Sequence, residues 1–252
     1  MFDFTDQVII VTGSASPRGI GKAIALEFAK QGGNVVIADM DEQGIQKNVA
    51  DVEAVGGSAM GIPLDITSKA SCDAMVQAVM DKWGRIDVLV NNAGLSQKVT
   101  VADLTMEDMR RIFDVNVFGL FLCTQSCLVP MRKARYGRII SLSSVAGKRG
   151  GGFFGGAHYS ASKAAVLGFS KNLAREVATE GITANCVCPG LTNTDIWKSL
   201  TKAEAEQAIA AIPMGRPGEP TEIAHTIMFL ASKEASYVTG EEIDINGGSH
   251  MD

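Results

Sequence analysis

Cysteine is scarce in this sequence and shows no metal-binding pattern. The 252 residues include five cysteines, which form neither a Cys-x-x-Cys pair nor a Cys/His cluster of the zinc-binding kind: Cys72, Cys123, Cys127, Cys186 and Cys188. Their spacing argues against a zinc site. We therefore expect no metal, and we expect these residues to be buried thiols in a reducing cytoplasm.

Long apolar runs and blocks of positive charge are also missing. The opening segment Met1–Asp6 carries acids where a secretory signal would carry bases, and no apolar run looks long enough to span a membrane. The formal charge is −5, and acidic and basic residues are interspersed, so there is no basic stripe for a nucleic acid. We expect a cytoplasmic protein with neither a membrane nor a nucleic acid as partner.

What the sequence does contain is a regular alternation of apolar runs and amphipathic stretches, without repeats or long linkers. The apolar runs are rich in Val and Ile, as in strands buried on both faces: Val8–Val11, Asn34–Ala38, Ala59–Leu64, Asp87–Val90, Arg138–Leu142, Thr183–Val187 and Glu242–Ile245. Helical periodicity marks the stretches between them: Ile20–Gln31, Glu42–Val55, Lys69–Trp83, Thr105–Met131, Ala157–Glu180 and Pro220–Ala231. The pattern predicts one doubly wound α/β domain over residues 1–252, with a parallel sheet and helices on both faces.

A glycine-rich turn, Thr12–Gly21, follows the first strand and precedes a helix. Its glycines let the chain bend sharply and let backbone N–H groups approach a pyrophosphate at the helix N-terminus. A tight strand–helix connection uses similar glycines, so the turn alone does not establish dinucleotide binding.

Asp39 ends the second strand, about twenty residues after the glycines. A carboxylate at this place accepts hydrogen bonds from the adenosine ribose and repels a 2′-phosphate, which favours NAD over NADP. Asp39 can instead be a turn or helix-capping residue, and Arg18 is a possible partner for a 2′-phosphate. We give Asp39 the greater weight and predict NAD.

Polar residues also follow the third and fourth strands, as Asp65-Ile66 and as Asn91-Asn92-Ala93-Gly94. Both sets fall at the carboxyl edge of the predicted sheet, where ligands bind in such folds. Asn and Gly are ordinary turn residues as well, so the second set taken alone is ambiguous.

Tyr159 and Lys163 lie four residues apart on a predicted helix, so both side chains project from one face. A phenol is a poor base at neutral pH, but a nearby ammonium group stabilises the phenolate. The pair can then exchange a proton with an alcohol or carbonyl as hydride moves. A serine hydroxyl from the preceding strand end would hydrogen-bond the substrate oxygen. Without this context, such a pair would merely cover a helix surface.

From Val8 to Gly248 the chain resembles the short-chain dehydrogenase/reductase family, through the glycine-rich turn, Asn91–Gly94, Ser144, Tyr159-x-x-x-Lys163 and Pro189-Gly190. The resemblance implies a Rossmann-type sheet of seven parallel strands, usually in a homotetramer. It implies a catalytic tetrad of Asn116, Ser144, Tyr159 and Lys163, with Ser143 as an alternative to Ser144 and with Asn116 holding a water in a proton relay. The residues assigned to the cofactor are Gly13, Arg18, Gly19, Ile20, Gly21, Asp39, Asp65, Ile66, Asn92, Ala93, Gly94, Tyr159, Lys163, Pro189, Gly190, Thr192 and Thr194.

Two loops depart from the usual family pattern. Five residues rather than three separate Gly13 from Gly19, so the contacts of Ser14–Arg18 cannot be transferred. The segment from Ser144 to Tyr159 is two residues longer than in the commonest version, which alters the substrate pocket.

Two segments are expected to line that pocket, Val145–His158 and a small substrate-binding segment around 191–215, with a helix over Ala203–Ile212. Neither shows an uninterrupted apolar lining, and five residues offer polar contacts: Ser96, Gln97, Lys148, Arg149 and His158. We therefore predict an NAD-dependent oxidoreductase for a small polar secondary alcohol (a sugar, polyol or hydroxy acid) and its carbonyl.

Three alternatives remain. Much of the chain resembles the 3-oxoacyl carrier-protein reductases of the same family, which generally use NADP and bind an acidic carrier through basic patches; Asp39 and Glu180 count against them. A non-catalytic protein that senses the dinucleotide is a second, although such proteins commonly lose the tyrosine or the lysine. A sugar-nucleotide epimerase or dehydratase is a third, although such relatives usually carry an added C-terminal domain.

Overall fold

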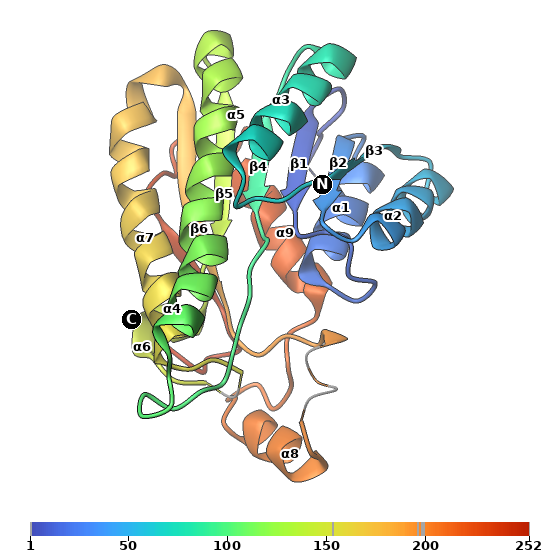
Figure 1. Cartoon of the computed structure of the whole chain (residues 1–252). Helices are drawn as coiled ribbons and strands as arrows, with labels where there is room; N and C mark the ends of the chain where they lie inside the picture. Colours follow the sequence, from blue (N-terminus) through green and yellow to red (C-terminus); the bar gives the residue numbers. More distant parts are fainter. Residues whose placement is uncertain (1, 153, 196, 198–199, 252) are drawn as a thin grey trace.

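Strands and helices alternate along the chain in the computed structural model (Figure 1), which describes residues 2–152, 154–195, 197 and 200–251. The strands form one parallel sheet in the order β3-β2-β1-β4-β5-β6-β7. Their bounds are β1 Val8–Thr12, β2 Asn34–Asp39, β3 Ser58–Pro63, β4 Val88–Asn91, β5 Gly137–Leu142, β6 Ile182–Pro189 and β7 Glu242–Ile245. The predicted doubly wound, seven-stranded fold is confirmed.

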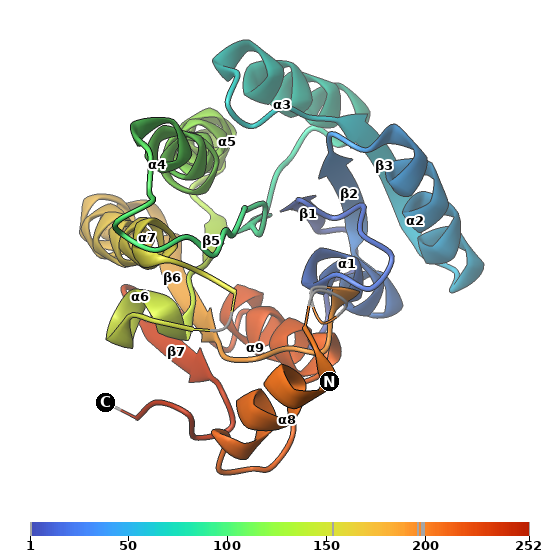
Figure 2. The ribbon, with the colours of Figure 1, turned by 60° about the horizontal axis from the view of Figure 1, so that its bottom comes forward.

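Helices join successive strands. Their bounds are α1 Ile20–Lys30, α2 Glu42–Ala54, α3 Lys69–Trp83, α4 Met106–Phe113, η1 Asp114–Gly119, α5 Leu120–Ala134, α6 Val145–Arg149, α7 Ala157–Val177, η2 Ala178–Glu180, α8 Lys202–Ala210 and α9 Pro220–Ala231. Helices α1 and α9 pack together beneath one face of the sheet, and α3, α5 and α7 cover the other (Figure 2).

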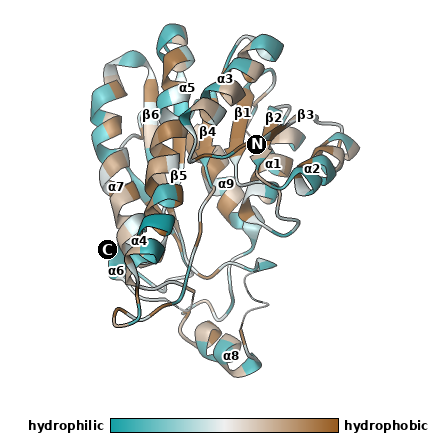
Figure 3. Ribbon diagram, in the orientation of Figure 1, coloured by the Kyte–Doolittle hydropathy of each residue, from teal (hydrophilic) through white to brown (hydrophobic). Residues whose placement is uncertain are grey.

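The strands are apolar because both faces of the sheet are buried. In β1, Ile9 and Val11 join the core that α1 and α9 complete, whereas Val8 and Ile10 join the core under α3, α5 and α7. Figure 3 shows the central strands as hydrophobic and the outer helix surfaces as mixed. Successive side chains of a strand point to opposite faces, so a continuous apolar run satisfies both cores at once.

The strand order reverses at β1, which pairs with β2 on one side and β4 on the other. The loops after β1 and β4 therefore diverge to opposite faces and leave a crevice at the carboxyl edge. The fold thus fixes where a ligand binds before any side chain is considered.

The predicted single helix Thr105–Met131 is a continuous helical run, Met106–Ala134, that passes through a π-helical turn at η1. By length and composition alone this run would cross a membrane, which corrects the statement that no such apolar run exists. In the fold it packs against α3 and α7, and 44% of its most apolar window is buried.

The glycine-rich stretch after Ser144 begins as a helix rather than as a loop, because α6 covers Val145–Arg149. Gly147 explains how α6 fits: a Cβ atom there would lie 2.8 Å from the backbone carbon of Lys163. The absent side chain lets α6 press against the backbone of α7 beside the tyrosine–lysine pair.

Candidate active site

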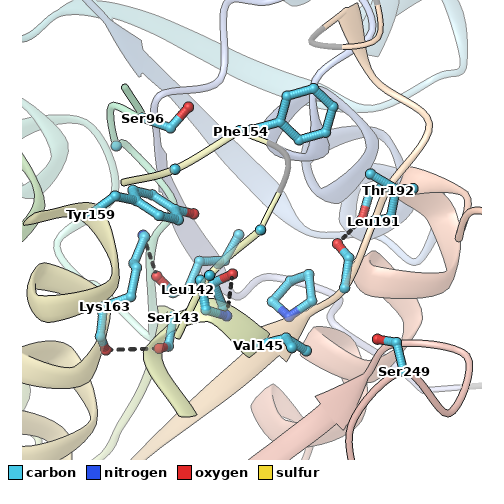
Figure 4. Close-up of a pocket in the computed structure, with 18 of the residues that line it drawn as sticks. Ser96, Leu142, Ser143, Val145, Phe154, Tyr159, Lys163, Leu191, Thr192 and Ser249 are labelled. Atoms are coloured by element: carbon cyan, nitrogen blue, oxygen red, sulfur yellow. Dashed lines mark hydrogen bonds between the residues drawn. The ribbon is translucent and has the colours of Figure 1, made fainter. Parts of the chain in front are cut away.

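The carboxyl ends of the strands surround a cavity of about 310 Å³ (Figure 4). Ten of the residues predicted for catalysis or cofactor binding line it: Ile20, Asn92, Gly94, Ser144, Tyr159, Lys163, Pro189, Gly190, Thr192 and Thr194. They come from segments more than 170 residues apart in the sequence, from Ile20 to Thr194. The carboxyl edge of the sheet brings these predicted residues together around one cavity.

Tyr159 and Lys163 occupy successive turns of α7 and both face the cavity (Figure 4). The Lys163 ammonium group donates a hydrogen bond to the carbonyl oxygen of Leu142 at 2.7 Å and lies 5.9 Å from the centre of the Tyr159 ring. Burial lowers the pKa of Lys163 to about 8. Burial also raises the pKa of Tyr159, although its hydrogen bond with Ser144 opposes that shift. The phenol therefore carries its proton at neutral pH.

The two candidate serines have different partners. The Ser143 hydroxyl is buried and donates to the carbonyl oxygen of Lys163 at 2.8 Å, which ties β5 to α7. Ser144 caps α6 by accepting a hydrogen bond from the Ala146 amide at 3.1 Å, and it also contacts the Tyr159 hydroxyl. The geometry favours Ser144 as the residue that meets a substrate oxygen.

Asn116 lies in the π-helical turn η1 and bridges two segments of the site. Its Oδ1 accepts from the Leu95 amide at 2.8 Å, and its Nδ2 donates to the Leu95 carbonyl and to Ser162 Oγ at 2.9 and 3.0 Å. Ser162 in turn donates to the Tyr159 carbonyl at 2.7 Å. Asn116 thus links the loop after β4 to the helix that carries Tyr159, and its role in a water relay stays a prediction.

The turn after β1 is shaped to approach a dinucleotide. Gly13 has a positive φ of 66°, and a Cβ atom there would lie 2.6 Å from Ala93 Cα. Gly19 caps α1 without a side chain, so no side-chain oxygen occupies the first turn of that helix. Backbone N–H groups at such a helix start bind phosphate, and the residues therefore fit a nicotinamide dinucleotide.

Other predicted cofactor residues hold the surrounding backbone. Asn92 donates from Nδ2 to the carbonyl oxygens of Thr12 and Gly13, both at 2.8 Å. Asp65 is exposed and accepts from the amide and hydroxyl of Thr67, while Ile66 is buried in the core. Gly190 donates to the Ile245 carbonyl and fits closely against Asn246. Their contacts with a bound dinucleotide stay predictions.

Ser249 lines the cavity, although it belongs to none of the motifs recognised in the sequence. It follows β7, the last strand, and its carbonyl oxygen accepts from Arg149 at 2.7 Å. The rule that residues after each parallel strand meet at one edge would have found it. Ser249 was not predicted because it lies outside every motif recognised in the sequence.

Comparison with known proteins agrees with the geometry. A family model described as enoyl-(acyl carrier protein) reductase matches residues 13–250. The chain is 40% identical over 245 residues to the 3-oxoacyl-[acyl-carrier-protein] reductase FabG of Vibrio cholerae, covering 97% of this chain and 98% of the relative. It is also 40% identical over 246 residues to (2S)-[(R)-hydroxy(phenyl)methyl]succinyl-CoA dehydrogenase subunit BbsD of Thauera aromatica, covering 98% and 97%.

Among solved structures, a 3-oxoacyl-[acyl-carrier protein] reductase from Brucella melitensis aligns with a TM-score of 0.92 and 33% identity, covering 99% of this chain and 93% of the other. The chain belongs to the short-chain dehydrogenase/reductase family. As a member of that family it is an oxidoreductase that acts on alcohol or carbonyl groups.

The preference for NAD over NADP, which rested on Asp39, is wrong. The relatives at about 40% identity include several 3-oxoacyl-[acyl-carrier-protein] reductases, the class for which the sequence resemblance implied NADP. The structure supplies the physical reason. Asp39 accepts backbone N–H groups from Ala15 at 2.9 Å, Met40 at 2.7 Å and Asp41 at 3.2 Å. The carboxylate serves as a turn residue, and these donors offset its charge.

Proposed function

We propose that this chain is an NADP(H)-dependent reductase of 3-oxoacyl thioesters, which it converts to the 3-hydroxyacyl thioesters. The carrying observation is the apolar substrate side of the cavity, formed by Leu95, Val145, Phe154, Leu191 and Ile212. An acyl chain fits such a lining, because burying apolar surface is favourable at roughly 25 cal/mol per Å². The identity to 3-oxoacyl reductases supports the same substrate class.

The polar contacts that favoured a small polar alcohol are mostly turned away from this cavity. Lys148 is buried and pairs with Asp244 at 3.0 Å. Gln97 and His158 bond to each other at 3.1 Å. Of the five predicted polar partners, Ser96 and Arg149 are the two among the described cavity-lining residues. Three of the five side chains on which the small polar substrate was argued therefore do not line the cavity.

The tetrad residues divide the chemistry between them. Burial raises the pKa of Tyr159, so the phenol is neutral before the reaction. It can then donate its proton to the substrate carbonyl oxygen. The Ser144 hydroxyl donates a hydrogen bond to the same oxygen as negative charge develops. The Lys163 ammonium group lies close to the Tyr159 ring. When protonated, it stabilises the phenolate that forms as Tyr159 gives up its proton. The nicotinamide group, when bound, supplies the hydride that reduces the carbonyl carbon.

Arg18 is the residue we assign to the 2′-phosphate of NADP(H). It is exposed in the loop between Gly13 and Gly19, and its guanidinium donates to Asn193 Oδ1 at 3.2 Å. A planar guanidinium binds phosphate through two parallel hydrogen bonds. The Asp39 carboxylate need not repel that phosphate strongly, because three backbone N–H groups already donate to it.

Glu180 does not argue against an acidic carrier as strongly as its charge implied. Arg132 donates to Glu180 at 2.8 Å and to Glu176 at 2.7 Å, so the Glu180 carboxylate is paired with a cation. We therefore keep both acyl carrier protein and coenzyme A as carriers of the thioester.

We further propose that residues 191–215 form the substrate-binding segment of a single 252-residue domain, that the protein is cytoplasmic, and that it is a homotetramer. Leu191, Ala208, Ala211 and Ile212 of that segment line the cavity. All five thiols are free and buried, which suits a reducing compartment. Exposed apolar side chains on the helical run Met106–Ala134, namely Phe118, Phe121 and Val129, support self-association.

Initial rates with an acetoacetyl thioester test the main proposal, with NADPH and NADH in parallel and with sugars, polyols and hydroxy acids as competing substrates. We expect NADPH-linked thioester reduction, and we expect Tyr159→Phe to lower kcat about 10²- to 10⁴-fold while NADPH binding is unchanged. NAD-linked oxidation of a polyol with silent thioesters would contradict the proposal, as would substantial activity in Tyr159→Phe.

A further inference from the structure

The catalytic helix α7 begins without a side-chain cap. Its N-cap residue is Gly156, which makes no side-chain hydrogen bond, and Tyr159 lies in the first turn. Four N–H groups at a helix start lack intrahelical partners, and uncapped first turns fray. Something other than a cap must hold the phenol in place.

Gln97, in the loop after β4, contacts the start of α7 from outside the helix. Its carbonyl oxygen accepts from the Gly156 amide at 2.8 Å. Its side-chain Oε1 lies 3.1 Å from Nε2 of His158, which is an N–H donor in the tautomer that this contact requires. Gln97 therefore hydrogen-bonds to two residues at the start of α7, Gly156 and His158.

Gln97 is itself anchored to a third element. Its Nε2 donates to Asp108 Oδ1 at 2.7 Å, and Asp108 closes the capping box at the start of α4 with Thr105. The start of α7 is thus connected through Gln97 to the start of α4.

His158 is completely buried, and its Nδ1 has no hydrogen-bond partner among the described residues. A buried polar atom without a partner costs free energy, so the imidazole is not the most stable side chain for this position. The surroundings are also tight, because a Cβ atom at Gly156 would lie 2.5 Å from the Val99 carbonyl oxygen and 3.1 Å from His158 Nδ1. A buried imidazole with an unpaired nitrogen, directly before Tyr159, indicates that His158 has a role other than stabilising the fold.

We propose that Gln97 and His158 form a clamp that positions Tyr159 for proton transfer, and that both are positioning residues of the reaction. The inference rests on the proposed catalytic role of Tyr159. The clamp holds the phenol from the N-terminal side of α7, while Asn116 and Ser162 hold the Tyr159 carbonyl from the other side. Ser96, the neighbour of Gln97, lines the cavity, so the same loop contacts the substrate side.

The test uses His158→Leu and Gln97→Met, which remove the side-chain contact and add little volume; Gln97→Met also keeps the backbone bond to Gly156. We expect kcat for the acetoacetyl thioester to fall about 10- to 100-fold, since small displacements of a catalytic group have effects of this size. The KM and the NADPH dissociation constant should change less than about threefold. The double variant should be no slower than Gln97→Met alone, because that change already removes the contact with His158.

Amide hydrogen exchange of the segment 157–163, measured without cofactor or substrate, is the second readout. We expect exchange at least about tenfold faster in both variants. Thr100→Val, which removes a hydrogen bond to Asp103 in the same loop, is the matched control and should behave as wild type.

Unchanged exchange, or unchanged kcat, in either clamp variant would overturn the proposal. So would a loss of kcat that merely tracks a loss of folded protein. If the wild-type chain reduces no thioester, the proposed function fails, but the exchange experiment still decides whether the clamp exists.

Discussion

At the scale of single residues, burying the Lys163 ammonium group in the site lowers the stability of the folded state. Burial lowers its pKa to about 8 from the usual 10.5. Because the unfolded chain keeps this proton up to higher pH, charged Lys163 destabilises the fold by about 3 kcal/mol below pH 8, and the penalty fades as pH rises toward 10.5. We expect Lys163→Met to abolish turnover and to raise the unfolding free energy at pH 7 by about 1–3 kcal/mol, since the lost bond to Leu142 offsets part of the gain.

Urea denaturation at pH 7 and pH 10 measures this effect. The stabilisation should shrink at the higher pH, and the exposed Lys133→Met should show no such change. A Lys163→Met protein less stable than wild type at pH 7 would show that the ammonium group is not penalised by burial.

At the scale of elements, the π-helical turn η1 decides where Asn116 points. A helix of regular pitch would carry the same residues past the sheet edge on a different face, whereas the wider turn lets Asn116 reach both the amide and the carbonyl of Leu95. We expect Asn116→Ala to leave these backbone groups unpaired, to cost about 1–3 kcal/mol of stability and to lower kcat.

Hydrogen exchange of the loop after β4, together with steady-state rates, checks this prediction. Asn185→Ala is the comparison, because Asn185 also bridges two backbone groups, donating to the Val238 carbonyl and accepting from the Glu241 amide, but lies outside the tetrad and the cofactor turn. Equal losses of kcat in the two variants would mean that Asn116 acts only through stability.

At the scale of the whole molecule, the helical run Met106–Ala134 keeps an apolar surface that the monomer does not cover. Phe118 is 54% exposed and Phe121 41%, with Val129 at 71% on the same run. We expect the wild-type chain to sediment as a tetramer through this surface, and Phe118→Lys with Phe121→Lys to give smaller species, because large apolar patches mark association sites. Val55→Lys, at the end of α2, should leave the mass unchanged. A wild-type monomer would exclude this assembly.

Much of the fold follows from local patterns that the sequence displays directly. The apolar runs predicted all seven strands to within a few residues. The signal is clearest in β1, β2, β4, β5 and β6, because strands buried on both faces are apolar along their length. The edge strands β3 and β7 are more exposed. The helix carrying Tyr159 and Lys163 followed from periodicity, and its chemistry followed from the i, i+4 spacing. The break at η1 and the short helix α6 did not follow, because they depend on contacts with α7 that periodicity does not record.

The sequence by itself determined the family, the sheet and the reacting side chains, since these depend on local pattern and on motifs with fixed spacing. Tertiary structure decided how the remaining polar groups are used. Backbone N–H groups donate hydrogen bonds to the Asp39 carboxylate. Lys148 forms an ion pair with Asp244, and the side chains of Gln97 and His158 hydrogen-bond to each other. A side chain's chemistry is encoded in the sequence, but whether that chemistry is free for a ligand depends on which distant groups the fold brings within hydrogen-bonding distance.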